Sequence, residues 1–311
     1  MDADVEVFAP ATVANVGCGF DVLGFALPRP GDSVVARPIP GQDLVIEAIV
    51  GEAEGIPFEV DGNTAGVAAR SLLEHLGVKK GIGLRLDKGI PIGSGAGSSA
   101  ASAVAAAVAV NELLGRPLDR RELLRFALEG EAIASGGAIH ADNVGPCLLG
   151  GMVLVRSNAD LDTVDIETPE ALFAAVVLPD HQILTTEARA ILRPEIPMKD
   201  AITQWGNVGG LVAGLMTGDF GLIGRSLVDV VAEPRRMSLI PGFADVRQAA
   251  LDAGALGCGI SGAGPAVFAL CEGDEPAFHT AIAMQHAFAE HGLSARRYVG
   301  PINPVGAQRI R

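Results

Sequence analysis

The glycine-rich segment from Pro91 to Ser102, PIGSGAGSSAAS, holds the residues whose types and spacing most clearly suggest chemistry. Its glycines alternate with small residues, so the backbone can adopt angles closed to other residues and its amides can approach a ligand. The Ala- and Val-rich residues that follow predict a helix beginning near Ser98 or Ser99. A helix start presents free N–H groups and a positive dipole end. The segment therefore predicts an anion site suited to nucleotide phosphate.

This loop differs from the common nucleotide-binding patterns. The chain contains no Gly-Lys pair, which excludes a Walker A loop. Ser98 stands where a dinucleotide fingerprint needs a third glycine or an alanine. The alternative interpretation is a plain turn before a helix that Ser98 or Ser99 caps. Taken alone, the loop leaves two interpretations equally open, a phosphate-binding site and a simple turn.

Two glutamates on a predicted helix over 119–134 are candidate metal ligands. Glu129 and Glu131 are two residues apart, so on a helix they face nearly opposite ways and at most one can point into a site. Magnesium beside a triphosphate needs only one or two carboxylates. One inward glutamate with a serine hydroxyl from the loop would suffice, whereas the alternative is a pair of surface glutamates.

Polar residues also gather in turns downstream. His140, Asp142 and Asn143 lie between glycines, where they suit a polar ligand or form an Asx turn that satisfies its own backbone. Arg189 and Arg236 lie in segments predicted as a helix start and a turn. In an acidic chain such arginines are natural clamps for a carboxylate or phosphate, although solvent-exposed arginines are the alternative.

A second glycine loop, GCGISGAGP over 257–265, precedes an apolar strand candidate. Its simplest interpretation is a tight turn between a helix and a strand. Its glycine density would also permit close approach to the first glycine loop or to phosphate.

The composition limits the classes of protein. The chain has 311 residues, 49% of them hydrophobic, enough for two ordinary domains. A net charge of −14 argues against a nucleic-acid partner. The four cysteines form no CxxC pair, which predicts buried reduced thiols and no zinc site. The acidic start is unlike a signal peptide, and no apolar run is long enough to span a membrane, so we expect a cytoplasmic protein.

The pattern of elements predicts an α+β protein of two domains, 1–160 and 161–311, joined by a polar connection over 157–170. Expected strands span 5–9, 32–37, 44–50, 83–87, 148–155, 172–178, 267–271 and 296–299. Expected helices span 64–76, 98–110, 119–134, 245–253 and 275–291, with a further helix starting near 186 and a helical region over 209–215.

Taken together and in this order, these segments resemble the GHMP kinase superfamily. Its three motifs correspond to PATVAN (10–15), the loop over 91–102, and the loop over 257–265. Within the superfamily the chain is most similar to the homoserine kinase family, through the segments over 10–24, 140–143, 185–189 and 233–243. The resemblance implies a nucleotide-binding N-terminal α+β domain and a ferredoxin-like C-terminal α+β domain.

The resemblance also implies roles for individual residues. ATP would be held by Pro91, Ile92, Gly93, Ser94, Gly95, Ala96, Gly97, Ser98, Ser99, Ala100 and Ala101, and Mg²⁺ by Ser99 and Glu131. The homoserine pocket would be lined by Asn15, Asp21, His140, Asn143, Arg189 and Arg236. Asn143, Thr185 and Arg189 would be the catalytic residues, with Thr185 near the transferring phosphate and with Asn143 and Thr185 orienting the hydroxyl.

The implied reaction transfers the γ-phosphoryl of ATP to the hydroxyl of L-homoserine, in the pathway to threonine. Such transfer depends mainly on positioning and electrostatics, so we expect no dedicated base, with Asp142 as the alternative. Two rival functions stay open. One is a kinase of another small alcohol, such as shikimate or mevalonate, and the other is a non-catalytic nucleotide sensor. The partners expected are small molecules, and a homodimer stays open.

Overall fold

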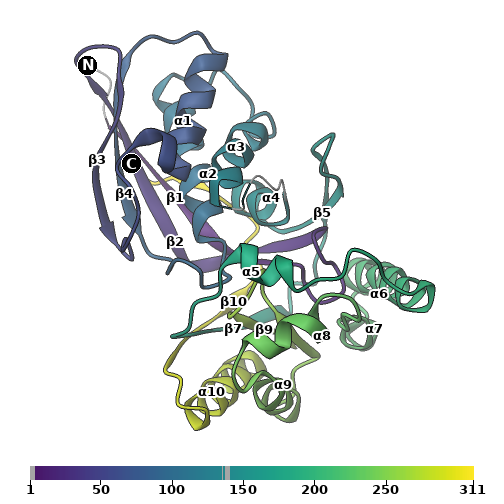
Figure 1. Ribbon diagram of the computed structural model, residues 1–311. Coiled ribbons are helices and arrows are strands. Elements are labelled where there is room, and N and C mark those ends of the chain that lie inside the picture. The colour runs from purple at the N-terminus through teal and green to yellow at the C-terminus, as the bar shows by residue number, and fades with distance from the viewer. Residues whose placement is uncertain (1–3, 135, 137–140) are drawn as a thin grey trace.

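The computed structural model describes residues 4–134, 136 and 141–311. Within them the chain forms two β-sheets, each covered by helices on one face (Figure 1). The first sheet belongs mostly to the N-terminal half and the second to the C-terminal half. This is the two-domain α+β architecture predicted from the sequence.

The first sheet has seven strands, in the order β11-β1-β2-β4-β3, with β5 pairing β2 and β6. All pairs are antiparallel except β3 with β4, which are parallel because helix α1 crosses between them. The strands are β1 (Val5–Ala14), β2 (Leu23–Ile39), β3 (Leu44–Gly51), β4 (Gly81–Lys88), β5 (Met152–Ser157), β6 (Asp162–Ile166) and β11 (Gln308–Arg309).

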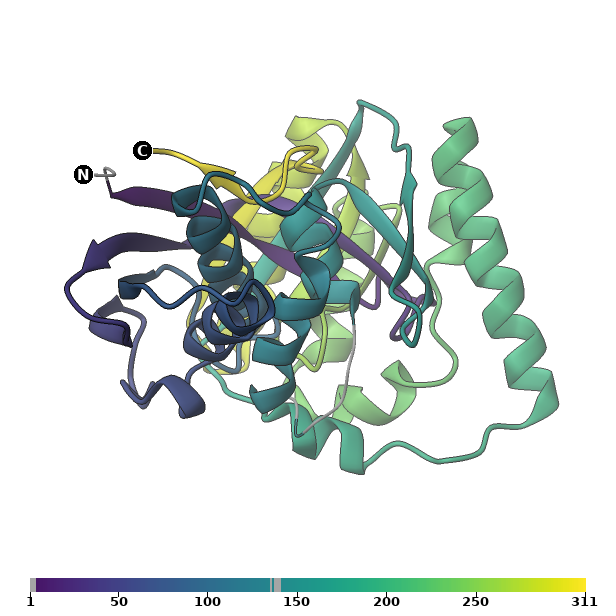
Figure 2. The ribbon, with the colours of Figure 1, turned by 90° about the horizontal axis from the view of Figure 1, so that it is seen from above.

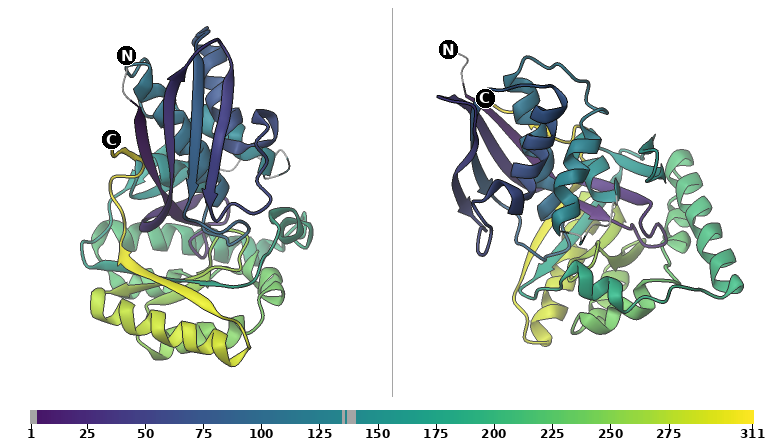
Figure 3. Two further views of the ribbon diagram at one scale, coloured as in Figure 1. Left: turned by 90° about the vertical axis from the view of Figure 1, so that its left-hand side faces the viewer. Right: turned by 45° about the horizontal axis from the view of Figure 1, so that its top comes forward.

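Four helices pack on one face of this sheet (Figure 3, left). They are α1 (Thr64–His75), α2 (Ser98–Leu113), α3 (Leu124–Ala134) and α4 (Ala141–Leu149). Helix α2 is central, and every residue from Ala100 to Asn111 is buried. A helix that is apolar all round must be surrounded by protein, and its many alanines let α1 and α3 approach closely. The sequence therefore places the middle of α2 deep within the molecule, whereas Ser98 and Ser99 at its start are half-buried.

The second sheet is antiparallel, in the order β10-β7-β9-β8. Its strands are β7 (Leu172–Pro179), β8 (Gly257–Ile260), β9 (Val267–Glu272) and β10 (Ala295–Pro301). Helices α9 (Phe243–Asp252) and α10 (Asp274–Glu290) pack against it. Numbered from one to four along the chain, these strands have the order 4-1-3-2, which is the predicted ferredoxin-like arrangement.

Four helices and a 3₁₀ turn connect β7 to α9, and one of these helices is long. They are α5 (Thr185–Ala190), the long α6 (Met198–Thr217), α7 (Phe220–Ser226), α8 (Glu233–Arg236) and the 3₁₀ turn η2 (Met237–Leu239); another 3₁₀ turn, η1 (Val60–Gly62), precedes α1. Helix α6 lies at one edge of the molecule (Figures 1 and 2).

Three local predictions need correction. The strand expected over 148–155 begins only at Met152, since the preceding residues close α4. The connection expected over 157–170 contains β6, which extends the first sheet. Asp119 and Glu122 exchange the hydrogen bonds of a capping box, yet they enclose a turn, and α3 starts at Leu124.

Two expectations about composition can be compared with the structure. All four cysteines are unpaired and buried, as predicted. Among the helices of the described residues, we find none with both the length and the hydropathy that a membrane span requires.

Candidate functional site

The glycine loop of 91–97 is shaped by three left-handed residues. Gly93, Gly95 and Gly97 have φ angles of 67°, 81° and 73°. Gly97 is also the residue that precedes α2, and no side chain caps this helix. Ser98, a predicted cap, instead donates its hydroxyl to the carbonyl of Ile90 at 2.9 Å. The first N–H groups of α2 therefore stay available for a ligand, as an anion site requires.

Neighbouring segments hold the carbonyl groups of the loop. The carbonyls of Ala96, Gly95, Ser94, Gly93 and Ile92 accept hydrogen bonds at 2.8–3.4 Å. Most donors belong to the C-terminal half of the chain; the set comprises Thr12 N, Ser261 Oγ, Ala266 N, Ile183 N and Gln182 Nε2. In these five contacts the loop contributes only carbonyl oxygens, so none of them uses a loop N–H group that an anion would need.

The second glycine loop provides part of this support. A Cβ on Gly95 would lie 2.6 Å from the carbonyl oxygen of Ser261, and one on Gly262 would lie 3.2 Å from the carbonyl oxygen of Gly95. The two glycine loops therefore approach each other closely, which was one of the two interpretations of the second loop.

The loop forms one wall of a cavity of about 320 Å³. At one end the lining is largely apolar, with Ile56 and Pro57 from the turn before α1, Leu86 from β4 and Ile92 from the glycine loop. The sequence analysis missed this end, because the residues over 55–64 show only turn signals. At the other end the lining is charged, with Asp21, Asp142, Arg189 and Arg236. The glycine loop lies between an apolar compartment and a charged one.

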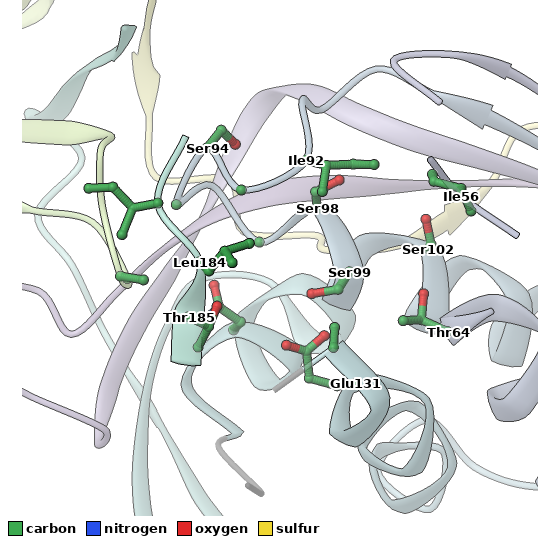
Figure 4. A pocket seen from close by; sticks show the side chains of 18 of the residues that line it. Ile56, Thr64, Ile92, Ser94, Ser98, Ser99, Ser102, Glu131, Leu184 and Thr185 are labelled. Carbon is green, nitrogen blue, oxygen red and sulfur yellow. The ribbon is translucent and has the colours of Figure 1, made fainter. Parts of the chain in front are cut away.

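Ser99 and Glu131 face one another beside the loop. Figure 4 shows their side chains directed toward each other, with Thr185 of α5 nearby. Glu131 lines the cavity, whereas Glu129 of the same helix contacts Ser71 on the exposed side. Burial raises the pKa of Glu131 to about 7, and a hydrogen bond from Ser99 opposes that rise. A carboxylate desolvated in this way fits a divalent cation, the kind of ligand expected next to phosphates.

Ser94 adds a hydroxyl to the wall of the cavity. Its Oγ is buried and has no hydrogen-bond partner among the residues that the structure describes. A buried hydroxyl without a partner is costly unless a ligand or water completes it. The sequence interpretation included Ser94 only as a member of the loop.

A buried ion pair lies beneath the start of α2. Lys88 contacts Asp32, and its Nζ also donates to the carbonyl of Ser98 at 2.9 Å and to Ser102 Oγ at 2.7 Å. Asp32 Oδ1 accepts from the amides of Gly89 and Ile90 at 3.0 and 3.2 Å. This network joins β2, β4 and α2 where the glycine loop begins. No local pattern in the sequence indicates this network, because Lys88 and Asp32 are 56 residues apart.

The loop between β1 and β2 brings Asn15 and Asp21 to the charged end. Asn15, Val16 and Asp21 have positive φ angles of 71°, 43° and 59°, which is unusual for residues other than glycine. The Asn15 side chain donates to the carbonyl of Gly262 at 2.7 Å and accepts from the amide of Asp21 at 3.1 Å. The second glycine loop thus holds a strained turn in place, a pattern typical of binding sites.

Asp21 and two arginines form a charged cluster. Arg189 donates from Nη2 and Nη1 to the two Asp21 oxygens, at 2.9 and 3.1 Å, while its Nε is buried without a hydrogen-bond partner in the described part of the chain. Buried Arg236 donates to the carbonyls of Ala188 and Gly262. Both guanidinium groups lie over the ring of Phe20, which the sequence analysis did not single out.

Asp142 and Asn143 lie in the first turn of α4, not in the irregular turn that the sequence suggested. Asn143 Oδ1 accepts a hydrogen bond from Thr12 at 2.7 Å, which directs its amide NH₂ group away from Thr12. Asp142 is buried, and its Oδ2 accepts from the amide of Asn15 at 3.3 Å. Burial, with a smaller contribution from the charge of Asp21, raises the pKa of Asp142 to about 7.

The structure therefore brings nearly all the predicted site residues to one cavity. Its lining includes Asn15, Asp21, Ile92, Gly93, Ser94, Gly95, Gly97, Ser98, Ser99, Glu131, Asn143, Thr185, Arg189 and Arg236. Pro91, Ala96, Ala100 and Ala101 belong to the same loop and helix without lining the cavity, and the last three are buried. His140 lies outside the described residues.

Comparison with known proteins identifies this arrangement. Residues 63–151 match the model of the GHMP kinases N terminal domain, and residues 211–290 match that of the GHMP kinases C terminal domain. A homoserine kinase of Chlorobium phaeovibrioides is 49% identical, with 98% of each chain covered. One of Xylella fastidiosa is 44% identical, covering 98% of this chain and 94% of that one.

A solved structure agrees with these relatives. The crystal structure of a homoserine kinase from Cytophaga hutchinsonii superposes with a TM-score of 0.97 at 49% identity, covering 100% of this chain and 98% of that one. The chain belongs to the GHMP kinases, a class of phosphotransferases with an alcohol acceptor, and within that class to the homoserine kinase family.

Proposed function

We propose that this protein transfers the γ-phosphoryl group of ATP to the side-chain hydroxyl of L-homoserine, giving O-phospho-L-homoserine for threonine biosynthesis. The observation that carries the proposal is the charge arrangement at one end of the cavity. There Asp21 is paired with Arg189, and Arg236 lies over the same Phe20 ring as Arg189, so one end of the site offers both an anion and cations. Among small alcohols, a hydroxy amino acid carries both an ammonium group for the anion of the site and a carboxylate for its cations.

In the proposed complex the charged end binds the amino-acid part. The Asp21 carboxylate accepts from the substrate ammonium, and the guanidinium groups of Arg189 and Arg236 bind its carboxylate. The unsatisfied Nε of Arg189 supports this role, because a carboxylate can complete its hydrogen bonding. Asn15 stabilises the strained loop that carries Asp21. His140 is proposed as a further pocket residue on the family resemblance alone.

The glycine loop is proposed to bind the phosphates of ATP, with the nucleobase in the apolar end near Ile56 and Pro57. The N–H groups at the start of α2 and the Ser94 hydroxyl are the donors. Ser99 and Glu131 would hold Mg²⁺, which would neutralise charge on the transferring phosphoryl group. Lys88 lies close by and secures the start of α2 through the Ser98 carbonyl.

Asn143 and Thr185 are proposed to orient the reacting groups. Both line the cavity, and the Asn143 amide group is free to donate because its oxygen is held by Thr12. Phosphoryl transfer needs little from a base, so the hydroxyl proton can leave late in the reaction. We assign Asp142 a positioning role, since its Oδ2 accepts a hydrogen bond from the amide of Asn15 in the loop between β1 and β2. With ATP and an amino acid as substrates, we propose a cytoplasmic location.

The test is ADP release with ATP and Mg²⁺ across L-homoserine, L-threonine, L-serine, shikimate and mevalonate. Strong turnover on L-homoserine and little on the rest would support the proposal. Turnover only on shikimate or mevalonate would contradict the assignment of Asp21 and the arginines. Bound ATP without turnover on any compound would favour a sensor, so nucleotide binding is measured in the same series by calorimetry.

A further inference from the structure

The aromatic ring of Phe20 lies beneath two cations of the charged cluster. The guanidinium carbon of Arg236 is 4.9 Å from the centre of this ring, and that of Arg189 is 5.5 Å away. The face of an aromatic ring carries negative electrostatic potential, so it attracts a cation that lies within about 6 Å of its centre. A single ring thus contacts both of the cations that we propose for the substrate carboxylate.

The ring contacts these arginines from outside the cavity. Arg189 and Arg236 both line the cavity, whereas Phe20 is half-buried and does not belong to the lining. A ligand in the cavity therefore meets the guanidinium groups and not the ring. Phe20 acts on a bound ligand through the position of the two arginines.

Arg236 is a buried cation whose hydrogen bonds go to neutral groups. The residue is 4% exposed, and its guanidinium group donates to the carbonyls of Ala188 and Gly262. Within the described residues it forms no ion pair with a carboxylate. Burial lowers the pKa of this guanidinium group, and the nearby charge of Arg189 lowers it further. The π face of Phe20 compensates part of the cost of keeping this charge in a desolvated place.

Arg189 depends on the ring for a different reason. Its two Nη atoms donate to the carboxylate of Asp21, at 2.9 and 3.1 Å. In the proposed complex this carboxylate also accepts from the substrate ammonium, so its attraction for Arg189 is shared with a second cation. The contact with the ring of Phe20 does not involve the carboxylate and therefore persists. It keeps Arg189 in place while the substrate carboxylate binds.

The backbone on both sides of Phe20 is fixed by hydrogen bonds. The carbonyl of Gly19 accepts from the amide of Leu23 at 2.9 Å. On the other side, the amide of Asp21 donates to the side chain of Asn15 at 3.1 Å. With its backbone held in this way the ring keeps only its own side-chain torsions, so it loses little conformational freedom when it packs against the arginines. Phe20 is therefore suited to act as a rigid support.

We propose that Phe20 is a positioning residue for substrate binding, whose ring face holds the guanidinium groups of Arg189 and Arg236 where they receive the substrate carboxylate. This inference deepens the proposed function and rests on it in one respect, namely that the two arginines bind a carboxylate. It does not require the acceptor to be homoserine, because every compound in the ADP-release series carries a carboxylate.

The first experiment removes the π face by Phe20→Leu in the full-length protein. We expect the KM for the acceptor to rise by about tenfold, with kcat and the KM for ATP within about twofold, because the ring acts through the carboxylate-binding arginines alone. Phe20→Tyr keeps an aromatic face and restores the KM. Phe278→Leu on α10 is the matched control, since it removes a ring 5.9 Å from Arg297 and leaves both KM values unchanged. An unchanged KM for the acceptor in Phe20→Leu, or an equal rise in the KM for ATP, would overturn the proposal.

The second experiment separates the electrostatics of the ring from its shape. Phenylalanines with one, two and three ring fluorines in place of Phe20 have nearly the same size, but their ring faces are progressively less negative. We expect the KM for the acceptor to rise with each fluorine, reaching about fivefold with three. An equal KM across the series would mean that the ring only fills space, and would overturn the proposal. The series is read with whichever compound the unchanged protein phosphorylates, so a wrong substrate assignment is distinguished from a wrong role for Phe20.

Discussion

Replacing Asp142 by asparagine separates a structural effect from a catalytic one. Burial raises the pKa of this carboxyl from 3.8 to about 7, so the folded protein must pay to ionise it. A shift of about three units corresponds to about 4 kcal/mol. Because the folded-state pKa is the higher one, this penalty is absent below pH 3.8, grows as the pH rises, and is complete above about pH 7.

Asp142→Asn removes that penalty and can keep the hydrogen bond from the Asn15 amide. At pH 8 we expect the free energy of unfolding to rise by about 2 to 4 kcal/mol, and at pH 5 by about 1 to 2 kcal/mol. Urea unfolding at both pH values measures the difference. Glu131 and Glu233, whose pKa values burial also raises, are present in both proteins and cancel. A gain that does not increase from pH 5 to pH 8 would refute this account of the burial of Asp142.

The same variant tests the chemistry. If Asp142 only positions the loop at Asn15, we expect turnover of homoserine to fall by about tenfold or less, since the neutral amide can still accept the hydrogen bond. General-base catalysis contributes about two to four decades in rate. A loss of three decades in ADP release, in a variant that is more stable at pH 8, would restore Asp142 as the base.

Three further substitutions test the rest of the site. Gly97→Ala places a Cβ against Thr12 Oγ1 at a residue with a positive φ angle, so we expect the KM for ATP to rise by about tenfold. Gly77→Ala is the control, because Gly77 has a similar φ angle with open space around it and so reports the effect of backbone strain alone. Arg236→Lys loses the fork that binds two carbonyls, and we expect KM for homoserine to rise at least tenfold with KM for ATP unchanged. Glu131→Gln should raise the Mg²⁺ concentration for half-maximal rate by about tenfold while calorimetric binding of metal-free ATP persists; an unchanged Mg²⁺ dependence would contradict the assignment.

The sequence predicted those parts of the molecule whose signals are local. The alternation of apolar residues located most strands and helices, and the glycine spacing located the loop before α2. The choice between Glu129 and Glu131 followed from helix geometry with the family resemblance. The short β8 escaped notice because its glycines resemble a turn, and the whole of α4 escaped notice because polar residues at its start resemble an irregular loop.

Features that depend on distant contacts gave no such signal. The pair of Lys88 and Asp32, the position of Phe20 beneath two arginines, and the hydrogen bond from Thr12 to Asn143 join segments far apart in the chain. The apolar end of the cavity comes from a turn of ordinary composition. The pKa values of Asp142 and Glu131 likewise follow from burial, which only the folded arrangement determines.

The support of the glycine loop by Ser261, Ala266 and Ile183 has a consequence for how the protein is made. During synthesis the N-terminal half can form its helices and every strand of its sheet except β11 before these residues exist. The phosphate site, however, stays incomplete until the chain has been extended past Ala266. A fragment ending before β7 would thus fold in part yet have no nucleotide affinity. ATP would then stabilise the folded state of the complete chain and not that of a shorter nascent chain.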